Sequence, residues 1–313
     1  MRIAIFDKVH PVLAERLTQA GHTCEIFHDA EIGRGTPSKL DGVIVRSRML
    51  SAELLSQWRD LRFVGRVGAG MENIDRNYCD QHGITVLNAP EGNRDGVGEL
   101  CVALTLILMK HIIRSNEQVR KGLWSREENR GSDLQGKTVG IIGHGNMGSA
   151  FADKLKGFDV RILVHDKYKS GFGSPGIEEC PLDLLLAESD VVSLHLPLND
   201  ETRYFADAAF FARVKRPIYF LNTSRGAIVD TEALLGAMDE GKVLAAGLDV
   251  LEFERNDLSG LDPTIKPGVQ QRLFGHERIV LTPHIGGVTH EGARKMAEIL
   301  ARKIIEAFPN DRS

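Results

Sequence analysis

Short segments rich in β-branched residues alternate with helical patterns along almost the whole chain, and this alternation limits the fold more than any other feature of the sequence. In the first third we predict strands at Ile3–Phe6, Cys24–Phe27, Val43–Val45, Phe63–Arg66 and Ile84–Val86. The segments between them show helical spacing, at Val12–Gln19, Ala52–Trp58 and Ile74–His82. Strands that alternate with helices form parallel sheets that are covered on both faces.

A second series of strands begins near residue 138. We predict six of them, at Thr138–Ile142, Val160–Val164, Val191–Leu194, Ile218–Leu221, Ala245–Leu248 and Ile279–Leu281, which is the number typical of a dinucleotide-binding sheet. One long apolar helix over Val97–Lys121 is expected to link the two series. The polar, proline-containing segment Arg255–His276 is predicted to be a surface loop, and an amphipathic helix is predicted after Pro283.

The composition excludes several classes of protein. A length of 313 residues suggests about two domains, and a net charge of −4 leaves no basic field for binding nucleic acid. The apolar run Leu100–Met109 is half of the roughly 20 residues that a membrane span needs. The four cysteines have no zinc-ligand or disulfide-framework spacing, so we expect no metal site and a reduced, cytoplasmic, soluble protein.

A glycine-rich turn carries the strongest functional signal. Gly143-His144-Gly145-Asn146-Met147-Gly148 directly follows a predicted strand and opens a predicted helix. In such a turn Gly143 permits the tight bend, Gly145 lets a pyrophosphate approach the backbone, and Gly148 allows the helix to pack on the strand. Asp166 ends the next strand, where a carboxylate accepts hydrogen bonds from ribose hydroxyls and repels a 2′-phosphate, so we predict NAD rather than NADP.

Three further segments follow later strands: residues 221–226, 247–254 and 282–287. Together with the glycine-rich turn they resemble the D-isomer specific 2-hydroxyacid dehydrogenase family, over nearly the whole chain. The resemblance implies that Arg225, Glu254 and His284 are the catalytic residues and that Asp249 helps to position the nicotinamide. The remaining cofactor-binding residues that it implies are Asn146, Met147, Thr223, Ser224, Gly286 and Gly287.

General chemistry supports these roles. The guanidinium of Arg225 can bind a 2-oxo carboxylate bidentately and polarise the neighbouring carbonyl. Hydride transfer to that carbonyl creates an alkoxide that needs a proton, for which His284 is a suitable donor. A carboxylate beside the histidine, here Glu254, favours the protonated imidazolium. Taken singly, Arg225 or Glu254 is more typical of a surface ion pair, and His195, which also ends a strand, is predicted to be structural or to line the cofactor site.

The first domain bears on the substrate. Its segments 43–48, 64–75 and 88–93 are similar to the phosphoglycerate dehydrogenases of this family. The backbone N–H groups of Val67, Gly68 and Ala69 can form a nest for a carboxylate, and Asn93 is a further predicted substrate residue. Arg46 and Arg66 are predicted to meet a phosphate; the alternative is that these arginines only pair with surface acids.

The resemblance implies two doubly wound α/β domains. We predict a Rossmann NAD-binding domain at residues 94–288, inserted in a flavodoxin-like substrate domain at residues 1–93 and 289–313. A homodimer through Leu100–Trp124 is expected. The chain ends at Ser313 directly after the last predicted helix, so we expect no C-terminal regulatory domain. Relatives commonly have Glu-Pro at the catalytic acid, whereas this chain has Glu254-Arg255 and a longer loop.

Three functions remain open. The first is NAD-dependent oxidation of 3-phosphoglycerate to 3-phosphohydroxypyruvate, the reaction that supplies serine biosynthesis. The second is reduction of glyoxylate or hydroxypyruvate, or another D-2-hydroxyacid dehydrogenase activity. The third, from another class, is an NAD-sensing scaffold like the corepressors that share this fold, because such proteins can keep all three catalytic residues.

Overall fold

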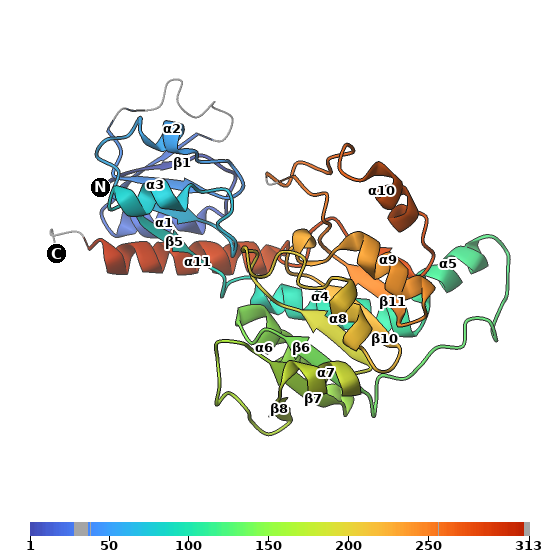
Figure 1. The fold of residues 1–313 in the computed structure, drawn as a ribbon. Coiled ribbons are helices and arrows are strands. Elements are labelled where there is room, and N and C mark those ends of the chain that lie inside the picture. The colour runs from blue at the N-terminus through green and yellow to red at the C-terminus, as the bar shows by residue number, and fades with distance from the viewer. Residues whose placement is uncertain (28–36, 38, 256, 310–313) are drawn as a thin grey trace. The chain divides into compact units, whose positions relative to one another are not determined.

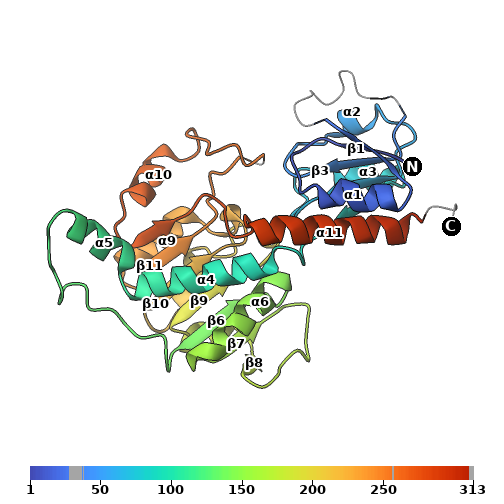
Figure 2. The ribbon, with the colours of Figure 1, turned by 180° about the vertical axis from the view of Figure 1, so that it is seen from behind.

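The chain folds into two α/β units, each built on its own parallel sheet (Figure 1 and Figure 2). The structure is a computed structural model and describes residues 1–27, 37, 39–255 and 257–309. Unit 1 comprises Met1–Arg94, Arg255–Gly260 and Gly287–Ser313, and unit 2 comprises Asp95–Glu254 and Leu261–Gly286. The segment Arg255–Gly260, which the predicted boundaries place in the inserted domain, therefore groups with unit 1.

The sheet of unit 1 has five parallel strands in the order β2-β1-β3-β4-β5. They are β1 (Arg2–Ile5), β2 (Thr23–Ile26), β3 (Gly42–Val45), β4 (Phe63–Arg66) and β5 (Thr85–Asn88). This is the flavodoxin-like order, and it reverses direction between β1 and β3. Ligands of such sheets bind outside the carboxyl ends of the strands at that reversal, so we expect a ligand site at the loops after β1 and β3.

Helices cover both faces of this sheet because its side chains alternate. Ile3 and Ile5 pack with α1 (Val12–Gln19) and α11 (His290–Ala307) on one face. Ala4 and Val43 pack on the other face with Leu55 of α2 (Ala52–Leu55) and Cys79 of α3 (Arg76–Gln81). The last helix of the chain thus completes the layer that the first helix begins.

The sheet of unit 2 has seven parallel strands in the order β12-β11-β10-β9-β6-β7-β8. They are β6 (Thr138–Ile142), β7 (Arg161–His165), β8 (Ile177–Glu179), β9 (Val191–Leu194), β10 (Ile218–Asn222), β11 (Val243–Leu248) and β12 (Ile279–Leu281). Starting from β6 this is the Rossmann order with one further strand, and the order reverses between β6 and β9. The predicted fold class, two parallel-sheet α/β domains, is confirmed.

Two hydrophobic clusters cover the faces of the unit 2 sheet. One contains Val139 and Ile141 with side chains of α4 (Arg94–Met109) and α6 (Asn146–Leu155). The other contains Ile142 and Leu163 with side chains of α7 (Leu182–Glu188), α8 (Ala208–Arg213) and α9 (Thr231–Asp239). Two 3₁₀ turns, η1 (Lys156–Phe158) and η2 (Gly226–Ile228), complete the unit with α5 (Ile112–Arg120) and α10 (Pro267–Phe274).

The prediction of one helix over Val97–Lys121 is wrong. The segment forms α4 and α5, whose axes differ by 60°, and His111 between them is left-handed with φ 53°. The cause is tertiary, because the Ser132 N–H donates to the Met109 carbonyl at 2.9 Å and so caps the end of α4. A side chain at Gly131 would overlap the same carbonyl oxygen, so glycine permits this contact.

Two further expectations are corrected. The predicted six-strand sheet has a seventh strand, β8, whose sequence Ile177-Glu178-Glu179 has too much charge to stand out as a strand. The predicted loop Arg255–His276 contains helix α10, which begins at Pro267 and buries Leu273. Both elements are short, and both are stabilised by neighbours distant in sequence. In unit 1, α3 begins at Arg76 rather than Ile74, because Asp75 accepts the Tyr78 N–H as its cap.

Candidate active site

The glycine-rich turn lies between β6 and α6, at the reversal of the unit 2 sheet. Gly143 has φ 100°, and a side chain there would overlap the carbonyl oxygen of His195. A side chain at Gly148 would overlap the carbonyl oxygen of Gly143. At Gly145, by contrast, an added Cβ meets no described atom within 4 Å. The space above Gly145 and the free N–H groups of the α6 N-terminus fit a pyrophosphate.

His195 helps to shape this turn. Its ring Nε2 lies 2.9 Å from the Ser193 hydroxyl, and the ring is almost fully buried. Burial lowers the pKa of His195 to about 3. The imidazole is therefore neutral near pH 7, in keeping with the structural role predicted for it rather than with proton transfer.

Asp166 follows β7 and faces the glycine-rich turn. Its Oδ2 accepts the His144 N–H at 2.7 Å, and its Oδ1 accepts the N–H groups of Tyr168 and Lys169, each at 2.9 Å. Although burial acts in the opposite direction, these three donors hold the pKa of Asp166 below its usual value. The carboxylate is thus negatively charged at neutral pH. It also borders a surface hollow together with Tyr168, Lys169 and Pro181.

We expect Asp166→Ala to narrow the preference for NAD over NADP by at least tenfold, about 1.4 kcal/mol. The reason is that the substitution removes the charge that repels a 2′-phosphate. Steady-state kcat/KM with each cofactor gives the ratio, and Asp200→Ala, at a surface residue of the same unit, is the control. Equal use of both cofactors by the unmodified protein would contradict the role of Asp166.

Asp249, directly after β11, organises the loop that follows β12. Its Oδ1 accepts the Thr282 hydroxyl at 2.5 Å and the Ile285 N–H at 2.8 Å, and its Oδ2 accepts the Gly286 N–H at 2.8 Å. The side chain is 1% exposed, and burial raises its pKa. The geometry shows Asp249 holding the 282–286 loop; contact with a nicotinamide stays a prediction.

His284 sits in that loop beside Glu254. The ring Nδ1 lies 3.0 Å from Glu254 Oε2, while Glu254 Oε1 accepts the Leu251 N–H at 2.8 Å. The residue is left-handed, with φ 55°, and its N–H donates to the Asp249 carbonyl at 2.7 Å. A left-handed histidine costs about 1–2 kcal/mol, so the surrounding hydrogen bonds must compensate. Nε2 has no hydrogen-bond partner among the described residues and is available for proton transfer.

Arg225 lies in the loop after β10, and its guanidinium donates to the Ser224 carbonyl at 2.6 Å. This loop is ordered by Asn222, whose side chain accepts from the Ser224 N–H and hydroxyl at 3.1 and 2.8 Å and donates to the Arg225 carbonyl at 2.9 Å. The loop also packs on the Leu251 backbone, where a side chain at Gly226 would overlap. Thr223 is anchored in the same loop, 3.3 Å from the Cys101 sulfur. Glycine at 226 therefore brings the Arg225 loop against the turn that carries Glu254.

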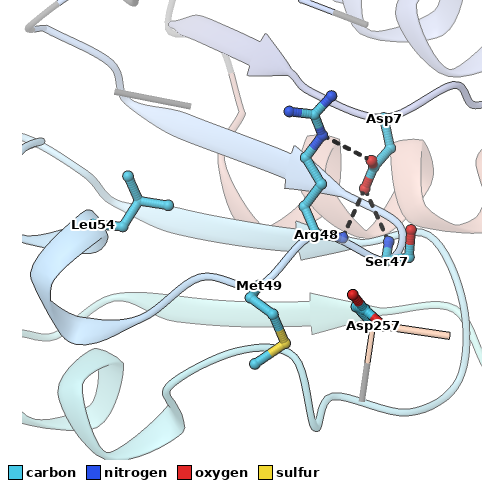
Figure 3. A pocket seen from close by; sticks show the side chains of 6 residues that line it. All are labelled: Asp7, Ser47, Arg48, Met49, Leu54 and Asp257. Carbon is cyan, nitrogen blue, oxygen red and sulfur yellow. Dashed lines mark hydrogen bonds and ion pairs between the residues drawn. The ribbon is translucent and has the colours of Figure 1, made fainter. Parts of the chain in front are cut away.

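Unit 1 has a surface hollow at the reversal of its own sheet, just past the ends of β1 and β3 (Figure 3). Asp7 is the central residue. Its Oδ2 accepts the N–H groups of Arg46, Ser47 and Arg48 at 2.5, 2.9 and 3.2 Å, and its Oδ1 accepts the Arg48 Nε–H at 3.2 Å. The lining is completed by Met49, Leu54 and Asp257. Asp7 thus fixes the backbone that presents Arg46, whose side chain is exposed.

The loop after β4 is less open to an anion than predicted. The Val67 N–H already donates to the Val45 carbonyl at 2.9 Å, and the Gly68 N–H donates to the Arg66 carbonyl at 3.0 Å. The Arg66 guanidinium lies directly over the Cα of Gly68, which has φ 155°. The nest is therefore reduced to the end nearer Ala69, whose carbonyl accepts from the Asn88 side chain at 2.6 Å.

Asn93 and Gly287 meet within unit 1. A side chain at Gly287 would overlap the Asn93 amide nitrogen, and the Asn93 amide oxygen is buried without a hydrogen-bond partner among the described atoms. Gly286, in unit 2, is held instead by Asp249. The two neighbouring glycines that were predicted together as cofactor residues thus have different anchors.

The structure gathers the predicted catalytic and most cofactor residues at one end of the unit 2 sheet, and Arg46, Arg66, Val67, Gly68 and Ala69 after the strands of unit 1. Asp7 and Gly226 also shape the two sites, and neither was predicted from the sequence. Their only signals in the sequence are an acidic residue two positions after β1 and a glycine directly after Arg225. Within the described ranges, no group of three or more His, Cys, Asp or Glu side chains could hold a metal ion. No single described helix is long and apolar enough to cross a membrane.

Comparison with known proteins agrees with this geometry. Residues 102–286 match the family description "D-isomer specific 2-hydroxyacid dehydrogenase, NAD binding domain", which confirms the predicted cofactor, NAD. The chain is 35% identical to the hydroxypyruvate reductase of Thermotoga maritima over 86% of its own length and 85% of that protein. It is 34% identical to the D-3-phosphoglycerate dehydrogenase of Archaeoglobus fulgidus over 97% of its own length, but it spans 57% of that relative.

Among solved structures, the chain is similar to the D-lactate dehydrogenase of Aquifex aeolicus, complexed with NAD and lactic acid. The TM-score is 0.82 at 29% identity, over 98% of this chain and 95% of that one. The glycine-rich turn, the His284–Glu254 pair and these matches agree, and the chain belongs to the D-isomer specific 2-hydroxyacid dehydrogenase family.

Proposed function

We propose that this protein transfers a hydride between NAD and C2 of a small D-2-hydroxy or 2-oxo acid. The observation that carries the proposal is the pair formed by His284 Nδ1 and Glu254 Oε2 at 3.0 Å, which leaves Nε2 available. The pair lies on the same unit as the glycine-rich turn and the Arg225 loop. Bound at that turn, NAD supplies the hydride acceptor or donor.

Side chains of this chain bind the substrate, transfer the proton and orient the histidine. Arg225 binds the substrate carboxylate and polarises the neighbouring carbonyl. Protonated His284 donates its Nε2 proton to the alkoxide oxygen during reduction, and neutral His284 removes that proton during oxidation. Glu254, held by the Leu251 N–H, orients the ring through Nδ1. Asp249 holds the loop in which His284 lies.

For the substrate we propose 3-phosphoglycerate, oxidised to 3-phosphohydroxypyruvate. The exposed Arg46, presented by Asp7, supports this proposal, as does the similarity to the Archaeoglobus fulgidus enzyme. The second candidate is reduction of hydroxypyruvate or glyoxylate. It is favoured by the match to most of the length of the Thermotoga maritima reductase, and by Asp7 and Asp257, whose negative charges beside Arg48 disfavour a phosphate in that hollow.

A steady-state assay with NADH tests these functions together. Its substrates are phosphohydroxypyruvate, hydroxypyruvate, glyoxylate and pyruvate, and 3-phosphoglycerate with NAD⁺ tests the reverse direction. The highest kcat/KM identifies the substrate class. Tight NAD binding without turnover of any acid would instead favour the NAD-sensing scaffold.

We expect Arg46→Ala to raise KM for the phosphorylated acid about tenfold while leaving glyoxylate almost unaffected. The reason is that a guanidinium contributes roughly 1.4 kcal/mol or more to a phosphate and nothing to an acid that lacks one. KM is measured for both substrates, with Arg59→Ala, another exposed arginine of unit 1, as the control. An equal loss with both acids would show that Arg46 acts structurally or binds the carboxylate.

We also propose a homodimer. Helix α5 buries none of its residues, and the region exposes large apolar side chains at Ile112, Ile113, Val119, Leu123 and Trp124, of which Trp124 is 78% exposed. A second copy of the chain would remove this surface from water. Sedimentation velocity should show a dimer for the unmodified protein and a monomer for the double variant Leu123→Asp/Trp124→Asp. A monomer for both would rule the interface out.

A further inference from the structure

A buried carboxylate, Glu252, lies two residues before Glu254 and takes no part in the proposed chemistry. Its side chain is 3% exposed. Oε1 accepts the Tyr204 hydroxyl at 2.9 Å and lies 2.9 Å from Lys266 Nζ, while Oε2 accepts the Thr231 N–H at 3.1 Å. Although burial alone acts in the opposite direction, Lys266 and these donors hold the pKa of Glu252 below its usual value. The carboxylate is therefore charged although it is buried.

Lys266, in the segment that follows Glu254, supplies the positive charge that compensates the Glu252 carboxylate. The residue is left-handed, with φ 43°, at the start of α10. Its ammonium also lies 5.3 Å from the centre of the Tyr204 ring and 3.6 Å from Asp230 Oδ1. Gln270 of α10 fixes the segment by donating to the carbonyls of Asp262 and Ile265 at 2.7 and 2.6 Å. Helix α10 itself packs beside α9 (Figure 1 and Figure 2).

The turn Leu251–Glu254 joins this cluster to the site. Glu252 anchors one side of the turn, Phe253 is fully buried and its carbonyl accepts the Asp262 N–H at 2.8 Å, and Glu254 extends to His284. The turn is short, so a displacement of Glu252 moves Glu254 with it. Lys266 comes from a loop that is longer than the Glu-Pro turn expected from the family resemblance. The loop begins at the Leu251–Glu254 turn, and its residue Lys266 comes back to pair with Glu252 of that turn.

We propose that Lys266 is a positioning residue, which neutralises buried Glu252 and thereby keeps the Leu251–Glu254 turn in place, with the Glu254 carboxylate against His284 Nδ1. This inference rests on the proposed function for its effect on turnover, but not for its effect on His284. Without Lys266, the Glu252 carboxylate keeps its two hydrogen-bond donors but loses the cation that balances its charge, so we expect the turn to shift and bring the carboxylate toward water. An unpaired buried charge is among the most destabilising features of a fold.

An NMR titration of His284 can report the position of the Leu251–Glu254 turn without a measurement of enzyme activity. Two carboxylates act on its ring, Glu254 through Nδ1 and Asp249 at longer range. Asp249 is held by Thr282, Ile285 and Gly286 rather than by the turn. Because a carboxylate beside an imidazole favours the protonated ring, withdrawal of Glu254 is the change that the experiment below is designed to detect.

The experiment compares Lys266→Met with Lys266→Arg, with the double variant Lys266→Met/Glu252→Gln and with Lys242→Met. Lys242 is the matched control, because its exposure, 36%, nearly equals that of Lys266 at 35%, and because it pairs at 2.9 Å with the exposed Glu240. Histidine NMR follows the His284 titration, assigned with His284→Gln. Activity in both directions, NAD affinity and Tm are measured on the same samples.

For Lys266→Met we expect the midpoint of the His284 titration to fall by about half a pH unit or more. We expect kcat to fall about tenfold, which is part of the 10²–10⁴ that a positioned acid–base group contributes. NAD affinity should be unchanged. Lys266→Arg and Lys242→Met should behave like the unmodified protein. In the double variant the His284 midpoint and kcat should both return to the values of the unmodified protein, because the amide that replaces the Glu252 carboxylate carries no charge and still accepts from the Thr231 N–H. Lys266→Gln, which keeps a donor without the charge, gives the same readouts if Lys266→Met does not fold.

The possible failures are distinct. If Lys266→Met lowers Tm but leaves the His284 midpoint and the pH–rate limbs unmoved, Lys266 is merely structural and the inference is overturned. It is also overturned if the double variant behaves like Lys266→Met, since the unpaired charge is then not the cause. If the unmodified protein turns over no acid while the midpoint still falls, the proposed function fails and the positioning role of Lys266 stands.

Discussion

Replacing His284 by alanine is expected to lower kcat by about 10²–10⁴, the usual contribution of a positioned acid–base group. The imidazole supplies or removes one proton per turnover, and no described side chain stands at Nε2 to replace it. NAD affinity and Tm should change little, because the backbone N–H of residue 284, which donates to the Asp249 carbonyl, is retained. Single-turnover rates separate chemistry from product release.

The control for this variant is His276→Ala, at a histidine of the same unit whose Nδ1 only accepts the Arg278 N–H. Glu254→Gln adds a second test, because the amide keeps the size but not the charge. Reduction needs imidazolium and oxidation needs neutral imidazole, so both limbs of the pH–rate profile should move to lower pH. Full activity of His284→Ala, or unmoved limbs in Glu254→Gln, would contradict the proposed chemistry.

The second large expected effect is a difference in stability between alanine variants of two glycines in the same turn, Gly143 and Gly145. Gly143→Ala is expected to destabilise unit 2 by about 2–4 kcal/mol, since φ 100° strains an alanine and its Cβ would overlap the His195 carbonyl oxygen. Gly145→Ala should cost less than about 1 kcal/mol, from its poorer capping of α6, because φ is −86° and the Cβ meets no described atom within 4 Å. Chemical denaturation measures both.

NAD affinity should show the opposite order for variants that fold. A Cβ at residue 145 occupies the space predicted for the pyrophosphate, so Gly145→Ala should weaken NAD binding at least tenfold in Kd, about 1.4 kcal/mol. Calorimetry gives this value directly. If Gly145→Ala binds NAD normally, the pyrophosphate does not approach the backbone at that residue, and the assignment of the turn is wrong.

Several site features were predictable because they depend on strand order. Gly143, Asp166, Arg225, Glu254 and His284 each follow a strand or its loop, and a parallel sheet brings all carboxyl ends of its strands to one edge. Sequence reasoning could place a carboxylate near a histidine in this way. It could not say that Nδ1 is the nitrogen that meets Glu254, because that depends on the left-handed backbone of His284.

The first domain was predicted less well because its local signals were ambiguous. Val67, Gly68 and Ala69 were predicted to form an anion nest, but the Val67 N–H already donates to the Val45 carbonyl, and Arg66 covers Gly68. Arg46 was predicted to meet a phosphate, but the sequence did not show that Asp7, about 40 residues earlier, accepts the N–H groups of Arg46, Ser47 and Arg48. No local pattern shows which carboxylate a loop will fold against.

Short-range periodicity and glycines with steric tasks were enough to predict the two parallel sheets and the place of the dinucleotide turn, and the family resemblance added the candidate catalytic residues. Tertiary contacts set the end of α4, the conformation of the loop after β3 around Asp7, and the pairing of Lys266 with Glu252. Each of these depends on a contact between segments distant in sequence. Packing and the cost of burying an unpaired charge select such contacts, and neither leaves a periodic trace in the chain.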